Sequence, residues 1–593
     1  MIVPMKKINV IVQAKDADSA VDKLRSLGFV HIEHQQPPLS NSITNLREDI
    51  TLASAAINNI SAPEYLKLEI GRQKDPADWK FVAKHIVELA KRLEQLEDYS
   101  RALVSRIQEW EHWGDFVPDK IEELKQKNIY IRLYQVPVKQ FPELPSSLIV
   151  KKIFLQAGFA HCVVITRSQA ELPFKEIPLP KMGLLAMRQR LYEDERMHDL
   201  IVDDLCRYLI HREALMNIRR DLEKELEFSE AVSGMGQEGA IAYLAGYAPV
   251  DALKPLEKTA KLEKWGLLAR DPAVDEEVPT LLRNGRWIAL IQPVFRLLGV
   301  LPGYRELDVS PLFLIFFSLF VGILIGDAGY GAVYLALAVL LRKLKGATLK
   351  NKNIFLLLYL LSSSAIIWGI LTGTFFGQDW LMARNIKPVL PALNNPITMQ
   401  TICFLLGAIH LTLAHTWRAL VKFPNRAFLA DLGWIAVLWT AYFLACTLIL
   451  AQPFPGFGLL LALGGIVLIL FFNEPRRNIV RTLGAGFTSV TFGLSFMSAF
   501  TDVVSYVRLF AVGLATVAIA NTTNAIAMGM GSGVAGFSAG ILIRVVGHAL
   551  NILLGPIAVL VHGVRLNVLE FGLNHTNITW SGKVYKPLAE QVI

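Results

Sequence analysis

The second half of this sequence is a series of apolar runs separated by short polar stretches. Each run approaches or exceeds the roughly 20 residues that a helix needs to cross a bilayer. The runs cover about 311–341, 354–376, 400–418, 430–450, 457–473, 487–528 and 536–572. Residues 1–288 are instead rich in charge and in helical patterns. Since 593 residues are too many for one domain, we expect a water-exposed domain over 1–288 and an α-helical transmembrane domain over 289–593.

Basic residues in the loops indicate how often the chain crosses the membrane, because cytoplasmic loops collect Lys and Arg. If the run 311–341 enters the membrane and returns at Gly326–Gly331 (GDAGYG), the basic loops all lie on the cytoplasmic side. These loops are 342–352, 418–426 and 474–481. We therefore predict about eight transmembrane helices, or seven with a re-entrant pair. Because the first residues lack the long apolar core of a signal peptide, we expect the N-terminal domain to be cytoplasmic.

The residue pattern of the N-terminal domain predicts two small α/β lobes joined by an antiparallel coiled coil, in the form of a dumbbell. The proximal lobe is expected over 1–36 and 240–288, the coiled-coil rod over 40–125 and 184–232, and the distal lobe over 126–183. Two runs of residues spaced three to four apart form the expected seam. They are Ile86, Leu89, Leu93, Leu96, Leu103, Ile107 and Trp110, and then Ile201, Leu205, Tyr208, Leu215, Leu222 and Leu226.

Several function classes find no support in the sequence. The G-x-x-x-x-G-K-[ST] motif that cradles nucleotide phosphates is absent, so we expect no ATP hydrolysis by this chain. The four cysteines are scattered without metal-ligand spacing, and we expect no metal or cofactor. The net charge of +8 fits lysines and arginines gathered in cytoplasmic loops, so nucleic acid is not needed to explain it.

Arg508 lies near the middle of the apolar run 487–528, and Arg565 lies in the last run. A guanidinium at the bilayer centre costs roughly 2.5 kcal/mol or more, so it is retained for a reason. At helical spacing, Ser505 shares a polar stripe with Arg508. A second stripe before Arg565 contains His562, Asn551 and His548. Such stripes should face each other or water and not lipid.

The acids near these arginines are expected on other helix faces. In a regular α-helix Asp502 lies about 120° from Arg508, and Glu570 about 140° from Arg565. Asp327 is the only other acid well inside an apolar run. This shortage predicts that the carboxylate partner of the arginines belongs to another chain. A purely structural role, in which the arginines bind backbone carbonyls between helices, remains the alternative.

Several motifs resemble one known family. They are Ser505–Ala511 (SYVRLFA), Gly547–Asn551 (GHALN) and Val561–Leu566 (VHGVRL), with Val278–Asn284, Gly326–Gly331, Gly407–His410 and Tyr585–Pro587 in the same order along the chain. This set resembles the membrane stator subunit of rotary V-type and A-type ATPases, called subunit a or subunit I. The resemblance covers nearly the whole chain and includes the dumbbell.

The resemblance implies a role for each polar residue in the membrane. Arg508 would face a rotating ring of proteolipid subunits and displace H⁺ or Na⁺ from the carboxylate of each, with Arg565 assisting. The remaining candidates for two offset half-channels are Ser505, Asp502, Asp327, His548, Asn551, His562 and Glu570. The cytoplasmic domain would bind peripheral stalks, and a central-stalk cap subunit would lie near the ring. By the same analogy the chain resides in a prokaryotic plasma membrane, and other subunits perform the ATP chemistry.

Two other functions remain open at this point. A self-contained secondary ion transporter would predict inverted repeats and broken helices around a midplane site. No internal repeat is evident, and such a transporter does not explain the coiled coil. A membrane-anchored scaffold without transport would leave Arg508 unexplained.

Overall fold

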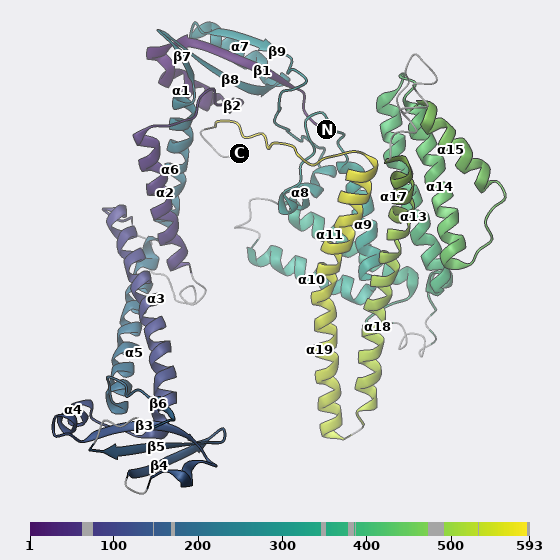
Figure 1. Ribbon diagram of the computed structural model, residues 1–593. Helices are drawn as coiled ribbons and strands as arrows, with labels where there is room; N and C mark the ends of the chain where they lie inside the picture. Colours follow the sequence, from purple (N-terminus) through teal and green to yellow (C-terminus); the bar gives the residue numbers. More distant parts are fainter. Residues whose placement is uncertain are drawn as a thin grey trace. The chain divides into compact units, whose positions relative to one another are not determined.

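The computed structural model describes residues 1–61, 75–145, 148–167, 172–345, 352–377, 385, 387–472, 491–531 and 533–589 (Figure 1). The chain divides into two compact units. One comprises Met1–Asn9, Phe29–His31 and Gly246–Pro587, and the other Val10–Gly28, Ile32–Ala245 and Leu588–Ile593. Each unit is described by itself below.

Four helices form the coiled coil of the second unit: α2 (Asn41–Ile60), α3 (Trp79–Trp110), α5 (Leu184–Arg207) and α6 (Arg212–Ser233). Helix α3 packs along α5, and α2 packs along α6 and α3. The predicted seam is confirmed, because Ile86 and Leu93 are buried in one cluster with Ile201, Leu205 and Leu215. The 3₁₀ turn η5 (Tyr208–His211) separates α5 from α6. Helices α2 and α3 begin at side-chain caps, Ser40 and Asp78.

The distal lobe of this unit is a four-stranded antiparallel sheet. Its strands are β3 (Tyr130–Pro137), β4 (Ile149–Gln156), β5 (Phe159–Thr166) and β6 (Lys175–Ile177), in the order β4-β5-β3-β6. The short elements η3 (Glu111–Trp113), α4 (Pro118–Gln126) and η4 (Phe141–Glu143) accompany it. Tyr134 lies opposite Cys162 in the β3–β5 register, and both are buried in the core of the lobe.

The N-terminal sheet has the strand order β2-β8-β1-β9, with β7 paired to β8. The strands are β1 (Met5–Gln13), β2 (His31–Glu33), β7 (Gly236–Glu238), β8 (Ile241–Pro249) and β9 (Gly266–Arg270). Its helices are η1 (Ala14–Asp16), α1 (Ala17–Leu27), η6 (Val250–Ala252) and α7 (Leu253–Leu262). The boundary between the two units passes through strands β1 and β8.

The apolar half of the sequence is mainly helical in its described residues. The first helices are η7 (Ile288–Ile291), α8 (Gln292–Leu298), α9 (Ser310–Ile325), α10 (Ala328–Lys345) and α11 (Asn353–Thr372). Then come η8 (Pro391–Asn394), α13 (Pro396–Lys422), α14 (Phe428–Leu450) and α15 (Gly458–Phe472). The last are α17 (Thr491–Ser505), α18 (Val507–Gly529), α19 (Val534–Ala558), and the π-helical η9 (Val559–Gly563) and η10 (Leu566–His575).

Among the described residues, five stretches are long and apolar enough to cross a membrane. They are Asn353–Thr372, Pro396–Lys422, Phe428–Leu450, Phe496–Gly529 and Val534–His575. Helices α9 and α15 are apolar but shorter. The expected break in 311–341 is present, because α9 ends at Gly326 in the left-handed conformation and α10 begins at Ala328. The count of eight crossings stays a prediction.

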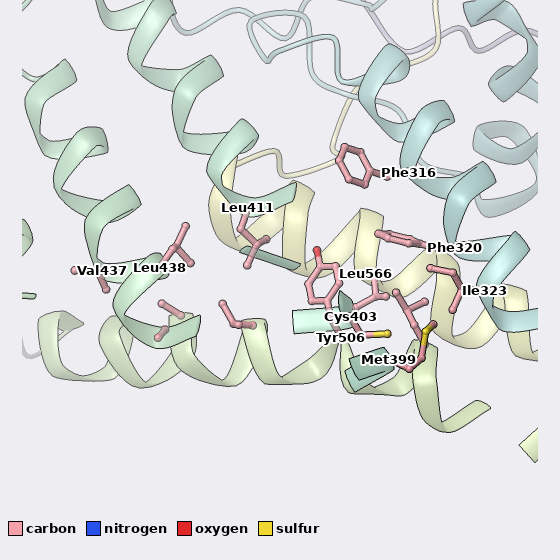
Figure 2. Packing of buried hydrophobic residues seen from close by; sticks show 14 of the residues in the cluster. Phe316, Phe320, Ile323, Met399, Cys403, Leu411, Val437, Leu438, Tyr506 and Leu566 are labelled. Carbon is pink, nitrogen blue, oxygen red and sulfur yellow. The ribbon is translucent and has the colours of Figure 1, made fainter. Parts of the chain in front are cut away.

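The core of the membrane helices surrounds Tyr506, the residue between α17 and α18 (Figure 2). Its ring is fully buried among Phe320 of α9, Cys403 of α13 and Leu566 of η10. Gly407 of α13 is required here, because a Cβ at that position would lie 2.7 Å from the Tyr506 ring. The residues on either side of Tyr506, including Arg508, are thereby fixed against the rest of the bundle.

Candidate functional site

Arg508 and Arg565 converge on one carboxylate, that of Glu570. Arg508 Nη1 lies 3.3 Å from Glu570 Oε1, and Arg565 Nε lies 3.4 Å from the same oxygen. The expectation that the chain lacks a carboxylate for its intramembrane arginines is therefore wrong. The error came from assuming a regular α-helix after Arg565. The segment Leu566–His575 is a π-helix, in which hydrogen bonds run from i to i+5, so residues five apart are stacked on one face.

The arginine cluster, defined as Arg508, Arg565 and Glu570, is unevenly exposed. The Glu570 side chain is 3% exposed, whereas those of Arg508 and Arg565 are 30% and 51% exposed. Within the described part of the chain, Glu570 Oε2 has no hydrogen-bond partner. Two guanidiniums thus share a single oxygen, and the cluster carries more positive than negative charge. The half-buried ring of His562 lies three residues before Arg565.

The second predicted stripe is organised around a tyrosine and not around the arginines. His548 Nδ1 lies 2.7 Å from Tyr330 Oη, and Asn551 Nδ2 donates to the same hydroxyl over 3.0 Å. Asn551 also donates to the carbonyl of Thr516 on α18, and His548 Nε2 lies 3.2 Å from Asn524 Oδ1. These contacts tie α10, α18 and α19 together. The predicted role of His548 and Asn551 in ion access, on one stripe with Arg565, stays a prediction.

Asp327 is a helix cap in the structure. Its carboxylate is fully buried and accepts four backbone N–H bonds, from Gly329, Tyr330, Phe376 and Gly377, over 2.8 to 3.1 Å. These bonds satisfy the start of α10 and hold the loop after α11. The expectation that Asp327 lines an aqueous path stays a prediction beside this capping role. Ser505 is likewise turned to the backbone, donating to the carbonyl of Asp502 over 2.7 Å.

Asp502 begins a buried polar chain that the sequence analysis did not predict. Its Oδ2 lies 3.2 Å from His575 Nε2 and accepts a bond from Asn574 Nδ2 over 3.0 Å. His575 Nδ1 lies 3.0 Å from His415 Nε2, and His415 Nδ1 lies 3.3 Å from Asp431 Oδ1. We call these four residues, Asp502, His575, His415 and Asp431, the buried relay.

Basic residues surround the Asp431 end of the buried relay. Lys422 Nζ lies 2.7 Å from Asp431 Oδ2, and Arg418 Nε lies 3.3 Å from Asp431 Oδ1. Arg418 also donates to the carbonyl of His575 over 2.9 Å. The sequence did carry a signal for these residues, because His415, Arg418 and Lys422 repeat at spacings of three and four along α13. An ionisable residue inside an apolar run marks a functional candidate, and that rule applied to His415 as well as to Arg508.

A small cavity lies beside α18, next to the residues that follow Arg508. Its volume is about 90 Å³, and its lining includes Thr372, Thr374 and Asn394 together with Leu509 and Gly513 of α18. A space of this size accommodates several water molecules, since one needs roughly 10–15 Å³. The hydroxyls and the amide of the lining supply the polar partners that such waters require.

Together, the helices and the buried charges define a polytopic α-helical membrane protein with a cytoplasmic N-terminal domain. Comparison with known proteins then narrows the class. No family model matches the chain.

The chain is 28% identical over 617 residues to "V-type ATP synthase subunit I" of Borreliella burgdorferi, covering 99% of both proteins. It is 29% identical over 635 residues to "V-type ATP synthase subunit I 1" of Treponema pallidum, covering 100% of both. A crystal structure of the cytoplasmic N-terminal domain of subunit I, homolog of subunit a, of V-ATPase covers 45% of this chain and 100% of that one, at 17% identity and a TM-score of 0.23. Over its whole length the chain is homologous to proteins named V-type ATP synthase subunit I, and over 70% of its length to one named A-type ATP synthase subunit I.

Proposed function

We propose that this chain is the stator subunit of a rotary V/A-type ATPase. Its membrane helices form ion half-channels against a rotating proteolipid ring, and its cytoplasmic domain binds the peripheral stalks. A central-stalk cap subunit lies near the ring. The complex resides in a prokaryotic plasma membrane, as the bacterial and archaeal sources of the relatives suggest.

The observation that carries this proposal is the charge of the arginine cluster. Two guanidiniums share one oxygen of Glu570, and both remain partly exposed. An unbalanced cation inside an apolar region is costly, and a passing carboxylate on another subunit relieves that cost. When such a carboxylate meets Arg508, the guanidinium favours its ionised form and releases the bound ion.

Exposed apolar side chains near Arg508 and Arg565 could contact the apolar helices of another subunit. Large apolar side chains of α18 and α19 are exposed along the same stretch of sequence. They include Leu514 and Ile526 of α18, and Leu550, Leu553, Ile557 and Leu560 of α19 and η9. Helices α18 and α19 pack side by side (Figure 1). A paired apolar surface interrupted by arginines is the surface that a ring of apolar helices with one carboxylate each would complement.

Two polar regions flank Arg508 and serve as the half-channels. Asp502 lies six residues before Arg508 in the sequence, and the 90 Å³ cavity lies beside the residues that follow it. His562 lies beside the arginine cluster, and His548 and Asn551 lie farther along α19. One polar region is then formed by Asp502 and the cavity, and the other by His562, His548 and Asn551. In the proposal, Arg508 separates these two regions and prevents the ion from leaking from one to the other.

The coiled coil, and the absence of a nucleotide-binding motif from the sequence, also support the proposed stator function. A rod of packed helices resists bending, and the cytoplasmic domain can therefore hold a peripheral stalk against a mechanical load. Nucleotide chemistry belongs to other subunits, because the sequence holds no phosphate-binding loop. The self-contained transporter receives no support from the relatives, whose names all refer to ATP synthase subunits.

Substitution of Arg508 tests the proposal. In the assembled complex in vesicles, Arg508→Ala should abolish ATP-driven ion pumping while the subunits still copurify. Arg286→Ala, the same change at an exposed arginine before the first membrane helix, is the matched control and should pump normally. Pumping by the Arg508→Ala complex at the control rate would refute the stator mechanism.

A further inference from the structure

The buried relay joins two acids through two directly contacting histidines. His415 on α13 and His575 at the end of η10 are 160 residues apart in sequence, yet their rings are 3.0 Å apart between Nε2 and Nδ1. Each ring uses its other nitrogen to reach an acid, Asp431 or Asp502. Every ring nitrogen of the pair therefore lies within hydrogen-bond distance of the next group.

All four groups of the buried relay are shielded from solvent. Asp431 is 0%, His415 2%, His575 5% and Asp502 7% exposed. The Trp434 ring stacks on His415, with ring centroids 6.1 Å apart. A ring-to-ring contact of this length leaves no space for a water molecule or a metal cation between the histidines. The connection from Asp502 to Asp431 therefore passes only what a hydrogen bond can pass, which is a proton.

For every contact of the relay to be a hydrogen bond, the relay needs one proton more than two neutral histidines supply. Three contacts join its four groups, and each hydrogen bond needs one proton. An ionised carboxylate only accepts, and a neutral imidazole donates from one of its two nitrogens. Two neutral rings therefore fill two of the contacts, and the remaining contact requires an additional proton. That proton can sit on Asp502, on either ring or on Asp431, and moving it along the relay only exchanges the ring tautomers.

The charges around the relay give it an inner end and an outer end. Lys422 Nζ and Arg418 Nε lie 2.7 and 3.3 Å from the Asp431 oxygens. The Lys422 side chain is 35% exposed and that of Asp431 only 1%, so this end reaches water through Lys422. Arg418, Lys422 and Arg426 belong to a basic segment, which the positive-inside rule assigns to the cytoplasm. The other end, Asp502, accepts from Asn574 and lies in the helix immediately before Arg508.

We infer that the coupling ion is a proton, and that His575 and His415 pass it between Asp502, beside the arginine cluster, and the cytoplasm at Asp431. This inference rests on the proposed function, since it takes the ring carboxylate as the source of the proton. A proton on Asp502 binds His575 Nε2 as the His575 Nδ1 proton moves to His415 Nε2. The His415 Nδ1 proton then moves to Asp431 Oδ1. The Lys422 ammonium, 2.7 Å from Asp431 Oδ2, gives a proton to water and takes the Asp431 proton in its place. Each ring is then left with its proton on Nε2, and both rings must turn and recover the Nδ1–H tautomer before the next proton passes. The reverse sequence carries a proton inward.

Glutamine substitutions separate proton transfer from packing. His415→Gln and His575→Gln keep an amide that hydrogen-bonds near the Nε2 position but cannot relay a proton. ATP-driven acidification of vesicles by the assembled complex should fall at least tenfold in each variant, with copurification of the other subunits unchanged. His198→Gln, at an exposed histidine of the coiled coil, is the matched control. A purely structural role would be rescued by glutamine, so acidification at the control rate would overturn the inference.

Ion identity in the unaltered complex provides a measurement that does not depend on folding of a variant. The relay predicts ATP-driven acidification in sodium-free buffer and no protonophore-resistant uptake of ²²Na⁺. Uptake of ²²Na⁺ that persists with protonophore would overturn the relay even if both variants fail to assemble. The proposed function is tested separately by Arg508→Ala. Loss of pumping in that variant together with sodium transport would keep the stator function and remove only the proton relay.

Discussion

Glu570 and Asp431 are both buried acids that meet two cations, and they differ in how completely they are paired. Asp431 uses both oxygens, with Lys422 on one and Arg418 and His415 on the other. Glu570 offers one oxygen to Arg508 and Arg565, and within the described residues its other oxygen is unpaired. The side chains of Arg508 and Arg565 are 30% and 51% exposed, and those of Arg418 and Lys422 are 17% and 35% exposed.

This difference indicates two purposes for buried charge in one membrane domain. The Asp431 network is locally complete and fixes α13 against α14 while ending the relay. The arginine cluster is incomplete, because the chain supplies one carboxylate for two guanidiniums. A site built only for packing would favour full pairing, since an unpaired buried charge is expensive. The incomplete site is therefore the one we expect to meet a group from outside the chain.

Removing the carboxylate of Asp431 should have the largest effect on stability. Asp431→Ala leaves His415, Arg418 and Lys422 without their acid, and breaking a buried ion pair costs about 3–5 kcal/mol. We expect a steep loss of folded chain, measured by thermal unfolding in detergent. Thr440→Ala, which removes a hydroxyl bonded only to a carbonyl of its own helix, is a suitable control. Equal stability of the two variants would contradict the proposed completeness of the Asp431 network.

Glu570→Gln should damage function more than stability. The amide keeps the shape but not the charge, so both guanidiniums lose their ion pair at a cost of about 1–3 kcal/mol. With the cluster left more positive, the ring carboxylate should be held too strongly, and pumping should fall more than tenfold. The measurement is the pumping rate per assembled complex beside the melting temperature. A variant that pumps normally would show that Glu570 has no part in tuning the arginines.

Asp327→Asn tests whether Asp327 serves as a helix cap alone or also as a channel residue. An amide cannot accept at both positions, so the N–H of Gly377 loses its acceptor, at about 1–2 kcal/mol. We expect a lower melting temperature and an unchanged pumping rate per assembled complex. A reduced rate with normal stability would place Asp327 in the ion path.

The smallest effect is expected at Glu276, a surface counterpart of the buried acids. Although partial burial raises its pKa, the hydrogen bonds from Lys7, Arg270 and the Ala273 amide outweigh that effect and lower the pKa to about 2. A depressed carboxyl pKa stabilises the fold above its unfolded value of 4.5, and that stability is lost as the pH falls from 4.5 toward 2.

Glu276→Gln should therefore destabilise by about 1 kcal/mol at pH 7, as expected of a partly exposed pair. The difference in the free energy of unfolding between this variant and the unaltered protein should be smaller at pH 3. Melting temperatures of both proteins at the two pH values test this. If the two melting temperatures differ more at pH 3 than at pH 7, the pKa of Glu276 is not lowered in the folded protein.

The sequence alone determined the features that depend on composition and spacing. Apolar runs give the membrane helices, because an uninterrupted run of that length has no soluble alternative. Heptad spacing gave the coiled coil, whose seam residues Ile86, Leu93, Ile201 and Leu205 are buried together. Arg508 and Arg565 stood out for the same reason, since a charge in an apolar run is costly wherever it lies.

Contacts that depend on local helix geometry and on distant segments were decided by the tertiary structure. Glu570 meets both arginines because η10 is a π-helix, and no residue spacing in the sequence announces that change of register. His415 meets His575 only because α13 packs against η10, 160 residues later in the chain. Sequence periodicity reports which face of a helix a residue occupies. Packing alone decides which distant side chain that face meets.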